Sequence, residues 1–137
     1  YLLNVDSLIS GRTDACRFAK AYVNEKRGLI IFPDGYTGTK EGTGIAPVND
    51  RSASIPDTPG SSVDPEVWAA MENAGCVFLP TEGVRVGVSV TSPDVGHYYS
   101  STSAGDTAAY YLNFGSTMNF EQIYRYHGGS VRLVCEE

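Results

Sequence analysis

Apolar side chains recur at spacings of three and four residues near the start of the chain, at Ala15, Phe18, Ala19 and Tyr22 or Val23. This spacing places them on one face of a helix. Thr13 or Asp14 precedes the run and offers a side-chain oxygen to the unpaired N–H groups of a first helical turn. Because residues 24–28 interrupt the pattern, the sequence predicts a first helix that ends before residue 24.

A second stretch carries stronger helix signals. Asp64 can cap the helix, Pro65 suits its first position, and Glu66 favours the positive end of the helix dipole. Gly75 stands where a left-handed residue commonly ends a helix. The apolar stripe between them, which we expect in the core and not against a cofactor, is Val67, Trp68, Met71 and Ala74.

Short β-rich runs separated by turns fill most of the remaining chain. Residues 29–32 form one such run and stop at Pro33-Asp34-Gly35, a strong turn signal. Residues 36–62 are rich in Gly, Thr, Pro, Ser and Asp, which predicts a long irregular loop. Later strands are expected at residues 77–79, 85–90, 98–101, 109–114 and 131–135. Two early helices followed by short antiparallel strands predict an α+β fold in a single domain, residues 1–137.

Length and charge narrow the possible functions. A chain of 137 residues supports one domain with a real core. Its net charge of -6 and the lack of any basic cluster beyond Lys26-Arg27 argue against nucleic-acid binding, which selects for clustered cations. No apolar run reaches the length of a membrane helix, so we expect no direct membrane insertion.

Residues 75–137 differ in composition from the rest. Tyr, Ser, Asn, Thr, His and Gly dominate residues 96–102, 109–114 and 124–129. Binding surfaces use such residues, because Tyr gives a large contact area at low entropic cost while Ser, Gly and Asn make adaptable hydrogen bonds. The composition favours a rigid scaffold that presents a binding face.

The order of several motifs in this chain resembles the Fibrobacter-type major paralogous domain, found in Bacteroidetes and their phages. The motifs are residues 74–80, 83–85, 98–102, and 125 with 128–134, together with residues 12–14 and 29–37 upstream. Tyr99 and Gly129 depart from the family pattern, which has Trp and an aromatic residue there. The domain is similar to the variable proteins of diversity-generating retroelements, so the resemblance implies a C-type lectin-like fold.

The resemblance also implies which residues contact a ligand. In retroelement-diversified proteins, changes at template adenines replace exposed side chains while the backbone is kept. Asn codons can then become Tyr, His, Asp, Ser, Gly, Thr, Val or Ile. The corresponding positions here are Val86, Val88, His97, Tyr111, Asn113, Ser116, Thr117, Asn119, Ile123, Tyr124, Tyr126 and His127. For Val86 and Val88 the alternative is that they alternate into the core. Arg125 and Arg132 are expected to hold the C-terminal segment through carboxylates or backbone carbonyls.

Other chemistry finds little support. His97 and His127 could join Asp94, Asp106 or Glu121 in an acid–base or metal site, but no catalytic or zinc motif surrounds them. Pro93-Asp94 is too little for a calcium site, which needs six to eight oxygens. We therefore predict neither a catalytic function nor a cofactor or metal. The three cysteines are either buried thiols or, as in C-type lectins, include a disulfide between Cys16 and Cys135.

The leading hypothesis is a ligand-binding domain of a diversified variable protein, displayed on a cell surface or phage virion, whose partner is a protein or glycan. The alternative is a structural cell-surface module without a diversified binding site.

Overall fold

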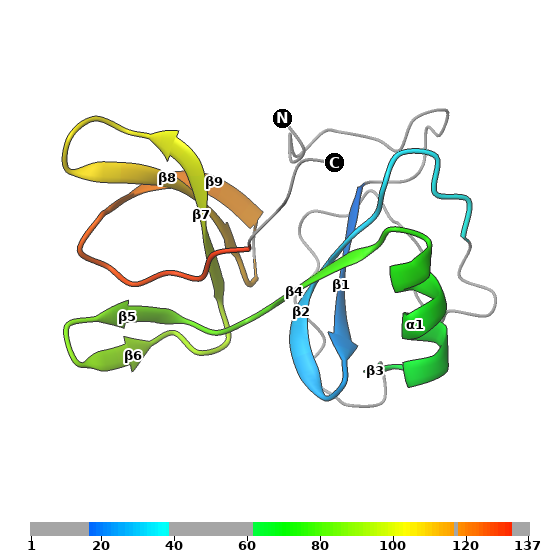
Figure 1. Cartoon of the computed structure of the whole chain (residues 1–137). Coiled ribbons are helices and arrows are strands. Elements are labelled where there is room, and N and C mark those ends of the chain that lie inside the picture. Colours follow the sequence, from blue (N-terminus) through cyan, green and yellow to red (C-terminus); the bar gives the residue numbers. More distant parts are fainter. Residues whose placement is uncertain (1–16, 39–61, 117, 133–137) are drawn as a thin grey trace. The chain divides into compact units, whose positions relative to one another are not determined.

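The structure is a computed structural model that describes residues 17–38, 62–116 and 118–132. These residues form three β-sheets and one short helix, with 52% in strands (Figure 1). The predicted α+β, C-type lectin-like fold with two helices is therefore wrong. The chain divides into two compact units, unit 1 (Tyr1–Pro80) and unit 2 (Thr81–Glu137).

The stretch predicted as the first helix is a strand of unit 1. β1 (Phe18–Val23) pairs antiparallel with β2 (Lys26–Ile31). Asn24 and Glu25 join them with φ angles of 49° and 64°, the left-handed geometry of a tight hairpin turn. Five of the six β1 residues are buried, and a run that is apolar on both faces also satisfies a spacing of three and four. The proposed N-cap, residues 13 and 14, lies outside the described residues.

The sheet of unit 1 has the order β3-β1-β2-β4. β3 (Ser62–Val63) pairs parallel with β1, and β4 (Val77–Pro80) pairs antiparallel with β2. The strands expected at residues 29–32 and 77–79 are thus present, with β2 beginning earlier than expected.

The helix α1 (Pro65–Asn73) confirms the second predicted helix. Asp64 caps it, because its Oδ1 accepts the N–H of Glu66 at 2.9 Å. Gly75 follows the helix with a φ of 90°, in the left-handed region that favours glycine. Within the described residues, no helix is long and apolar enough to cross a membrane.

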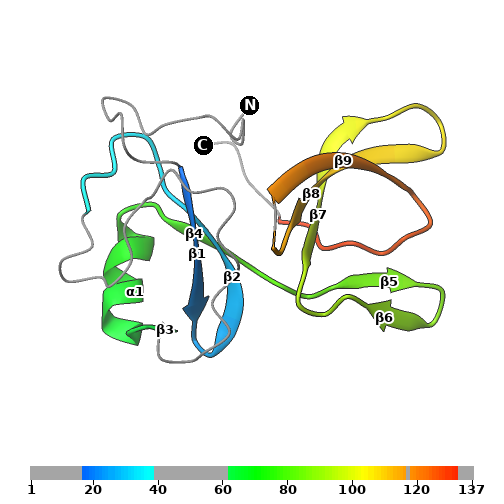
Figure 2. The ribbon, with the colours of Figure 1, turned by 180° about the vertical axis from the view of Figure 1, so that it is seen from behind.

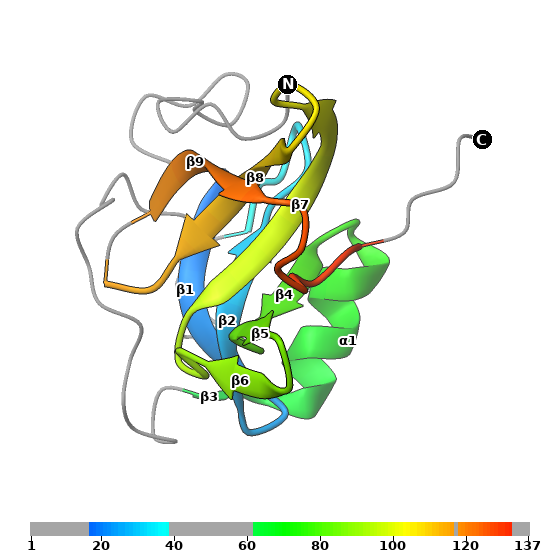
Figure 3. The ribbon, with the colours of Figure 1, turned by 90° about the vertical axis from the view of Figure 1, so that its left-hand side faces the viewer.

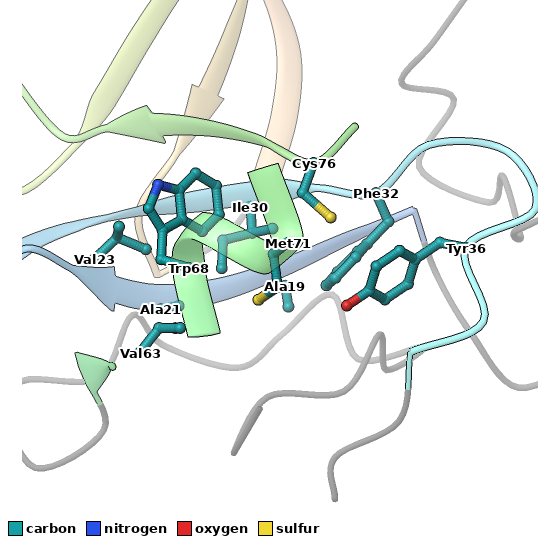
Figure 4. Close-up of a cluster of buried hydrophobic side chains, with 10 residues drawn as sticks. All are labelled: Ala19, Ala21, Val23, Ile30, Phe32, Tyr36, Val63, Trp68, Met71 and Cys76. Atoms are coloured by element: carbon teal, nitrogen blue, oxygen red, sulfur yellow. The ribbon is translucent and has the colours of Figure 1, made fainter. Parts of the chain in front are cut away.

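Trp68 and Met71 are buried, as predicted, and Figure 4 shows them directed at the strands of unit 1. The Trp68 ring meets the Phe78 ring edge-on, with centroids 5.9 Å apart. A Cβ on Gly28 would lie 2.4 Å from the Phe78 ring, so glycine makes room for that ring. The same cluster contains Ala19, Ala21, Val23, Ile30, Phe32, Tyr36, Val63 and Cys76.

Cys76 is the cysteine whose surroundings the structure describes. It is a buried free thiol, and burial raises its pKa to about 11, against a smaller opposing effect of the Tyr36 hydrogen bond. The thiol is therefore protonated at neutral pH and acts as a small apolar group, in agreement with the buried-thiol alternative for this residue. Cys16 and Cys135 lie outside the described residues, so the alternative of a disulfide between them is untested.

Unit 2 consists of a two-stranded hairpin and a three-stranded antiparallel sheet of order β7-β8-β9 (Figure 2). The hairpin strands are β5 (Val84–Val86) and β6 (Ser89–Thr91). The sheet strands are β7 (Gly96–Ser103), β8 (Ala108–Phe114) and β9 (Met118–Tyr124).

Three sequence expectations for unit 2 are corrected. The single strand predicted at residues 85–90 is the hairpin, because Gly87, with a φ of 60°, reverses the chain between β5 and β6. Strand β9 was not predicted, and its mostly exposed residues show why an apolar pattern is missing there. Val131 and Arg132, predicted to begin a final strand, belong to no strand, and residues 133–135 lie outside the described residues.

One side of the three-stranded sheet holds the apolar packing of unit 2. Phe114 is fully buried, and its ring lies over Gly96, where a Cβ would come within 2.1 Å of it. Tyr98 stacks on Phe114 with ring centroids 5.9 Å apart. Because side chains alternate across a sheet, His97 and Asn113, which are paired in the ladder, lie on the other side.

Candidate ligand-binding surface

The segment after β9, residues 125–132, returns to the opposite edge of the sheet and is called the C-terminal segment (Figure 3). Gly128 and Arg85 exchange two backbone hydrogen bonds of 2.8 Å. Ser130 donates to the carbonyl of His97 at 2.8 Å and accepts from the N–H of Tyr99 at 3.1 Å. These bonds attach the C-terminal segment both to the hairpin and to β7.

Tyr99 also holds the C-terminal segment from the face of the sheet. Its hydroxyl donates to the carbonyl of His127 at 2.7 Å, with the carbonyl of Tyr124 at 3.3 Å. A Cβ on Gly129 would lie 2.8 Å from the Tyr99 ring, so the ring occupies the space that a side chain at residue 129 would need. Tyr99 and Gly129 are therefore direct neighbours in the structure.

Three aromatic side chains that the sequence nominated gather around the end of β9. The rings of Tyr124 and Tyr126 stack at 5.3 Å, and the His127 ring meets Tyr126 edge-on at 4.5 Å. Tyr124 is 56% exposed and Tyr126 is 72% exposed. These rings hold one another in place while keeping much of their surface open to solvent.

The hairpin adds two exposed valines. Val86 is 40% exposed and Val88, at the turn, is 98% exposed. The alternative that both alternate into the core is therefore wrong, since only Val84 of β5 is buried. Because Val88 is almost fully exposed, its side chain adds no hydrophobic stabilisation to the fold. A single exposed valine needs no explanation, but a contiguous exposed apolar area is typical of a binding surface.

The valines and the aromatic rings come from segments that pair with each other. Arg85 and Gly128 form an antiparallel bridge, so Val86, which follows Arg85, runs beside His127, which precedes Gly128. We call the resulting area the Tyr–Val surface, made of Val86, Val88, Tyr124, Tyr126 and His127.

His97 and Tyr111 do not belong to this surface, because they are only 8% and 7% exposed. Their rings stack with centroids 5.6 Å apart, and the Tyr111 hydroxyl donates to Oε2 of Glu121 at 2.8 Å. Burial, the hydrogen bond to Glu121 and its charge raise the pKa of Tyr111 to about 12. The expectation of an outward-facing Tyr111 is wrong.

His97 is buried as a neutral ring. Burial lowers its pKa, against smaller opposing effects of the backbone of Val95 and Gly83 and of the Glu121 charge. Its Nδ1 has no hydrogen-bond partner among the described residues, and neither has the buried Nδ1 of His127. His97 therefore serves as a packing partner of Tyr111 and not as a solvent-facing contact.

Three nominated residues line one small hollow of about 210 Å³ in unit 2: His97, Asn113 and Ser116, together with Ser92, Val95 and Gly115. Its polar groups are hydroxyls, an amide and a neutral imidazole, so it carries no formal charge. A volume below the usual range of ligand pockets suits ordered water or a single side chain of a partner.

The remaining nominated residues are scattered. Asn119 is exposed on β9, and Ile123, opposite Ala109, is half-buried. Thr117 lies outside the described residues. Several exposed apolar residues were missed by the sequence reasoning, and alternation along β6 would have signalled the first of them: Val90, Tyr110, Phe120 and Val131.

Arg125 has the structural role predicted for it. Its guanidinium donates to the carbonyls of Ala108 at 3.0 Å and Gly105 at 3.1 Å, and to the Ser103 hydroxyl at 2.6 Å. It therefore ties the start of the C-terminal segment to the turn between β7 and β8.

Across the described ranges, no group of three or more His, Cys, Asp or Glu side chains is placed to hold a metal ion. Comparison with protein-family models, curated proteins and solved structures finds no match. Function must therefore be argued from the surface itself.

Proposed function

We propose that unit 2 is a ligand-binding module whose Tyr–Val surface docks against a protein or glycan. The observation that carries the proposal is the exposed Tyr124–Tyr126 stack, whose segment pairs with the hairpin that bears the exposed Val86 and Val88. Aromatic side chains are enriched at the centres of interfaces, because they bury a large area and lose few rotamers.

Rigidity of the supporting backbone strengthens the proposal. The Arg85–Gly128 bridge, the Tyr99 hydroxyl and the Arg125 guanidinium all hold the segment that bears Tyr126 and His127. Side chains on a backbone fixed in this way lose less entropy when a partner binds. An ordinary solvent-exposed surface requires neither exposed aromatic rings nor hydrogen bonds that fix the backbone beneath them.

The expected setting is a cell surface or a phage virion, where a domain of this kind meets its partner outside the cell. We further propose that variation among copies of the protein falls on exposed positions: Val88, Ser116, Asn119, Tyr124 and Tyr126. His97 and Tyr111 are excluded from this set, since a buried stacked pair tolerates few side chains. A reverse transcriptase gene beside a near-copy of the coding segment, differing at adenines, would support this genetic part.

The binding test begins with arrays of glycans and surface proteins probed with the intact chain. For any ligand found, the double variant Tyr124→Ala/Tyr126→Ala should weaken binding by about thirtyfold or more, as expected when central aromatic contacts are truncated. Tyr110→Ala is the matched control, since Tyr110 is a 39% exposed tyrosine outside the Tyr–Val surface.

Two results would contradict the proposal. One is a double variant that folds and binds as tightly as the wild-type chain. The other is the lack of any ligand on both arrays, which would favour the structural module instead.

A further inference from the structure

The ladder between β7 and β8 is interrupted in its middle. Tyr99 pairs with Tyr111 and Ser103 pairs with Ala109, so Ser100, Ser101 and Thr102 face Tyr110 alone. A bulge of this kind leaves residues outside the ladder and bends the strand away from its neighbour. The sequence predicts a strand over residues 98–101 without such an interruption.

A hollow of about 360 Å³ opens at the bulge. Its walls come from β7, β8 and the C-terminal segment, and its lining residues are Tyr99, Ser100, Ser101, Thr102, Ser103, Ala109, Arg125 and Val131. The volume falls within the range of small-molecule sites in proteins.

The frame of this hollow is held by bonds already described. Arg125 spans Ser103, Gly105 and Ala108, while the Tyr99 hydroxyl bonds to the C-terminal segment. A site that is held before the ligand arrives loses less free energy to ordering when it binds.

Apart from the Arg125 guanidinium, the polar side-chain groups of the described lining are neutral hydroxyls. Within the described ranges, the hydroxyls of Ser101 and Thr102 have no hydrogen-bond partner, whereas the Ser100 hydroxyl accepts from the N–H of Thr102 at 3.1 Å. A hydroxyl both donates and accepts, so the two open groups match another hydroxyl in either direction. Tyr99, Ala109 and Val131 supply apolar surface beside them.

Charged ligands fit this lining poorly. Among the described residues no carboxylate lines the hollow, so none of them offers a divalent cation an anionic ligand there. Arg125 is the one cation among the described lining residues, and its Nε and Nη2 already donate to Ala108, Ser103 and Gly105, so only its Nη1 is left to meet an anion. The remaining chemistry is that of a small neutral molecule with hydroxyl edges and C–H faces.

We propose that the bulge hollow of unit 2 binds one neutral pyranose ring, either a free monosaccharide or the end of a glycan. Ser101 and Thr102 hydrogen-bond the sugar hydroxyls, and Tyr99 with Val131 packs on the C–H face. This proposal does not rest on the Tyr–Val surface. The two proposals involve different side chains, so the experiments test them separately.

The test is an amide-resolved NMR titration of the intact chain with glucose, galactose, mannose and N-acetylglucosamine. At least one sugar should shift the amides of residues 100–103 and 109 with a Kd of about a millimolar, the weak affinity that few hydrogen bonds provide. Glucose 6-phosphate serves as an anionic probe and should bind no more tightly than glucose. A glycan ending in the same sugar should produce the same shifts if the ligand is a glycan terminus.

Variants separate this site from any other. Thr102→Val keeps the side-chain shape and removes one hydroxyl, and should weaken binding by about tenfold. Ala109→Leu fills the hollow and should abolish the shifts. Ser62→Ala, which removes an exposed hydroxyl in unit 1, is the control and should leave binding unchanged.

Three outcomes would overturn the proposal: no sugar in the panel shifts these amides, the shifts survive both Thr102→Val and Ala109→Leu, or the phosphorylated sugar binds much more tightly. If the Ala109→Leu variant does not fold, the loss of sugar affinity in Thr102→Val is the measurement that tests the proposal.

Discussion

Tyr111 donates its hydroxyl proton to Glu121 at 2.8 Å, across paired positions of β8 and β9. Tyr111 is buried and Glu121 is exposed, so the hydrogen bond links a buried side chain of unit 2 to one at its surface. It also turns Tyr111, nominated as a contact residue, into a part of the framework.

The first prediction concerns alkaline pH. The folded-state pKa of Tyr111 is raised to about 12 from the ordinary 10.0, so the folded chain holds this proton more tightly than the unfolded chain. The contribution is fully present below pH 10.0 and is lost as pH rises toward about 12. Thermal unfolding across this window should show a decline in stability that is shallower in Tyr111→Phe. An equally steep decline in the variant would show that Tyr111 is not responsible.

The second prediction separates framework from surface. Tyr111→Ala should lower the free energy of unfolding by about 3–5 kcal/mol, the usual cost of truncating a buried aromatic side chain. Tyr124→Ala and Tyr126→Ala should each cost about 1 kcal/mol or less, as exposed substitutions do. Urea denaturation monitored on the intact chain measures all three. Comparable losses at positions 111 and 126 would mean that Tyr126 is a core residue and the Tyr–Val surface is misassigned.

The third prediction concerns acidic pH and His97. Burial lowers the folded-state pKa of His97 below the ordinary 6.5, so the unfolded chain takes up this proton more readily. The stabilising contribution is present above pH 6.5 and is lost as pH falls below that value toward the folded-state pKa. His97→Gln, which cannot be protonated in this range, should reduce the loss of stability between neutral and mildly acidic pH. NMR titration of the His97 ring carbons gives an independent reading, and an elevated pKa would contradict the prediction.

The fourth prediction concerns Cys76. Because its pKa is raised to about 11 and the side chain is buried, alkylation of the folded chain at neutral pH should be slow. Peptide mapping after iodoacetamide treatment should find Cys76 unmodified until denaturant is added. Rapid labelling in the absence of denaturant would show that unit 1 opens or that the thiol is accessible.

Several features could be read from local sequence because local chemistry creates them. The cap at Asp64, the proline at the first helical position and the left-handed Gly75 act within a few residues of α1, and the helix appears where they predict it. The structural role of Arg125 was also foreseen, although its partners Gly105 and Ala108 could not be named.

Other features depend on partners that are distant in the sequence. Strand β9 lacks an apolar pattern and exists because it pairs with β8 along its whole length. The bulge at residues 100–102 follows from the register of β7 against β8. The sequence of β7 alone does not indicate this register. The burial of His97 beside Tyr111 likewise requires the pairing of two strands.

The amino-acid sequence alone determined where α1 begins and ends, and that a Tyr-rich stretch occupies the second half of the chain. Only the tertiary structure decided that residues 18–23 form a strand, and that Tyr111 is buried while Tyr124 and Tyr126 are exposed. The physical reason is that capping and turn formation are settled among neighbours along the chain. Strand pairing and burial are settled by contacts with residues far away in it.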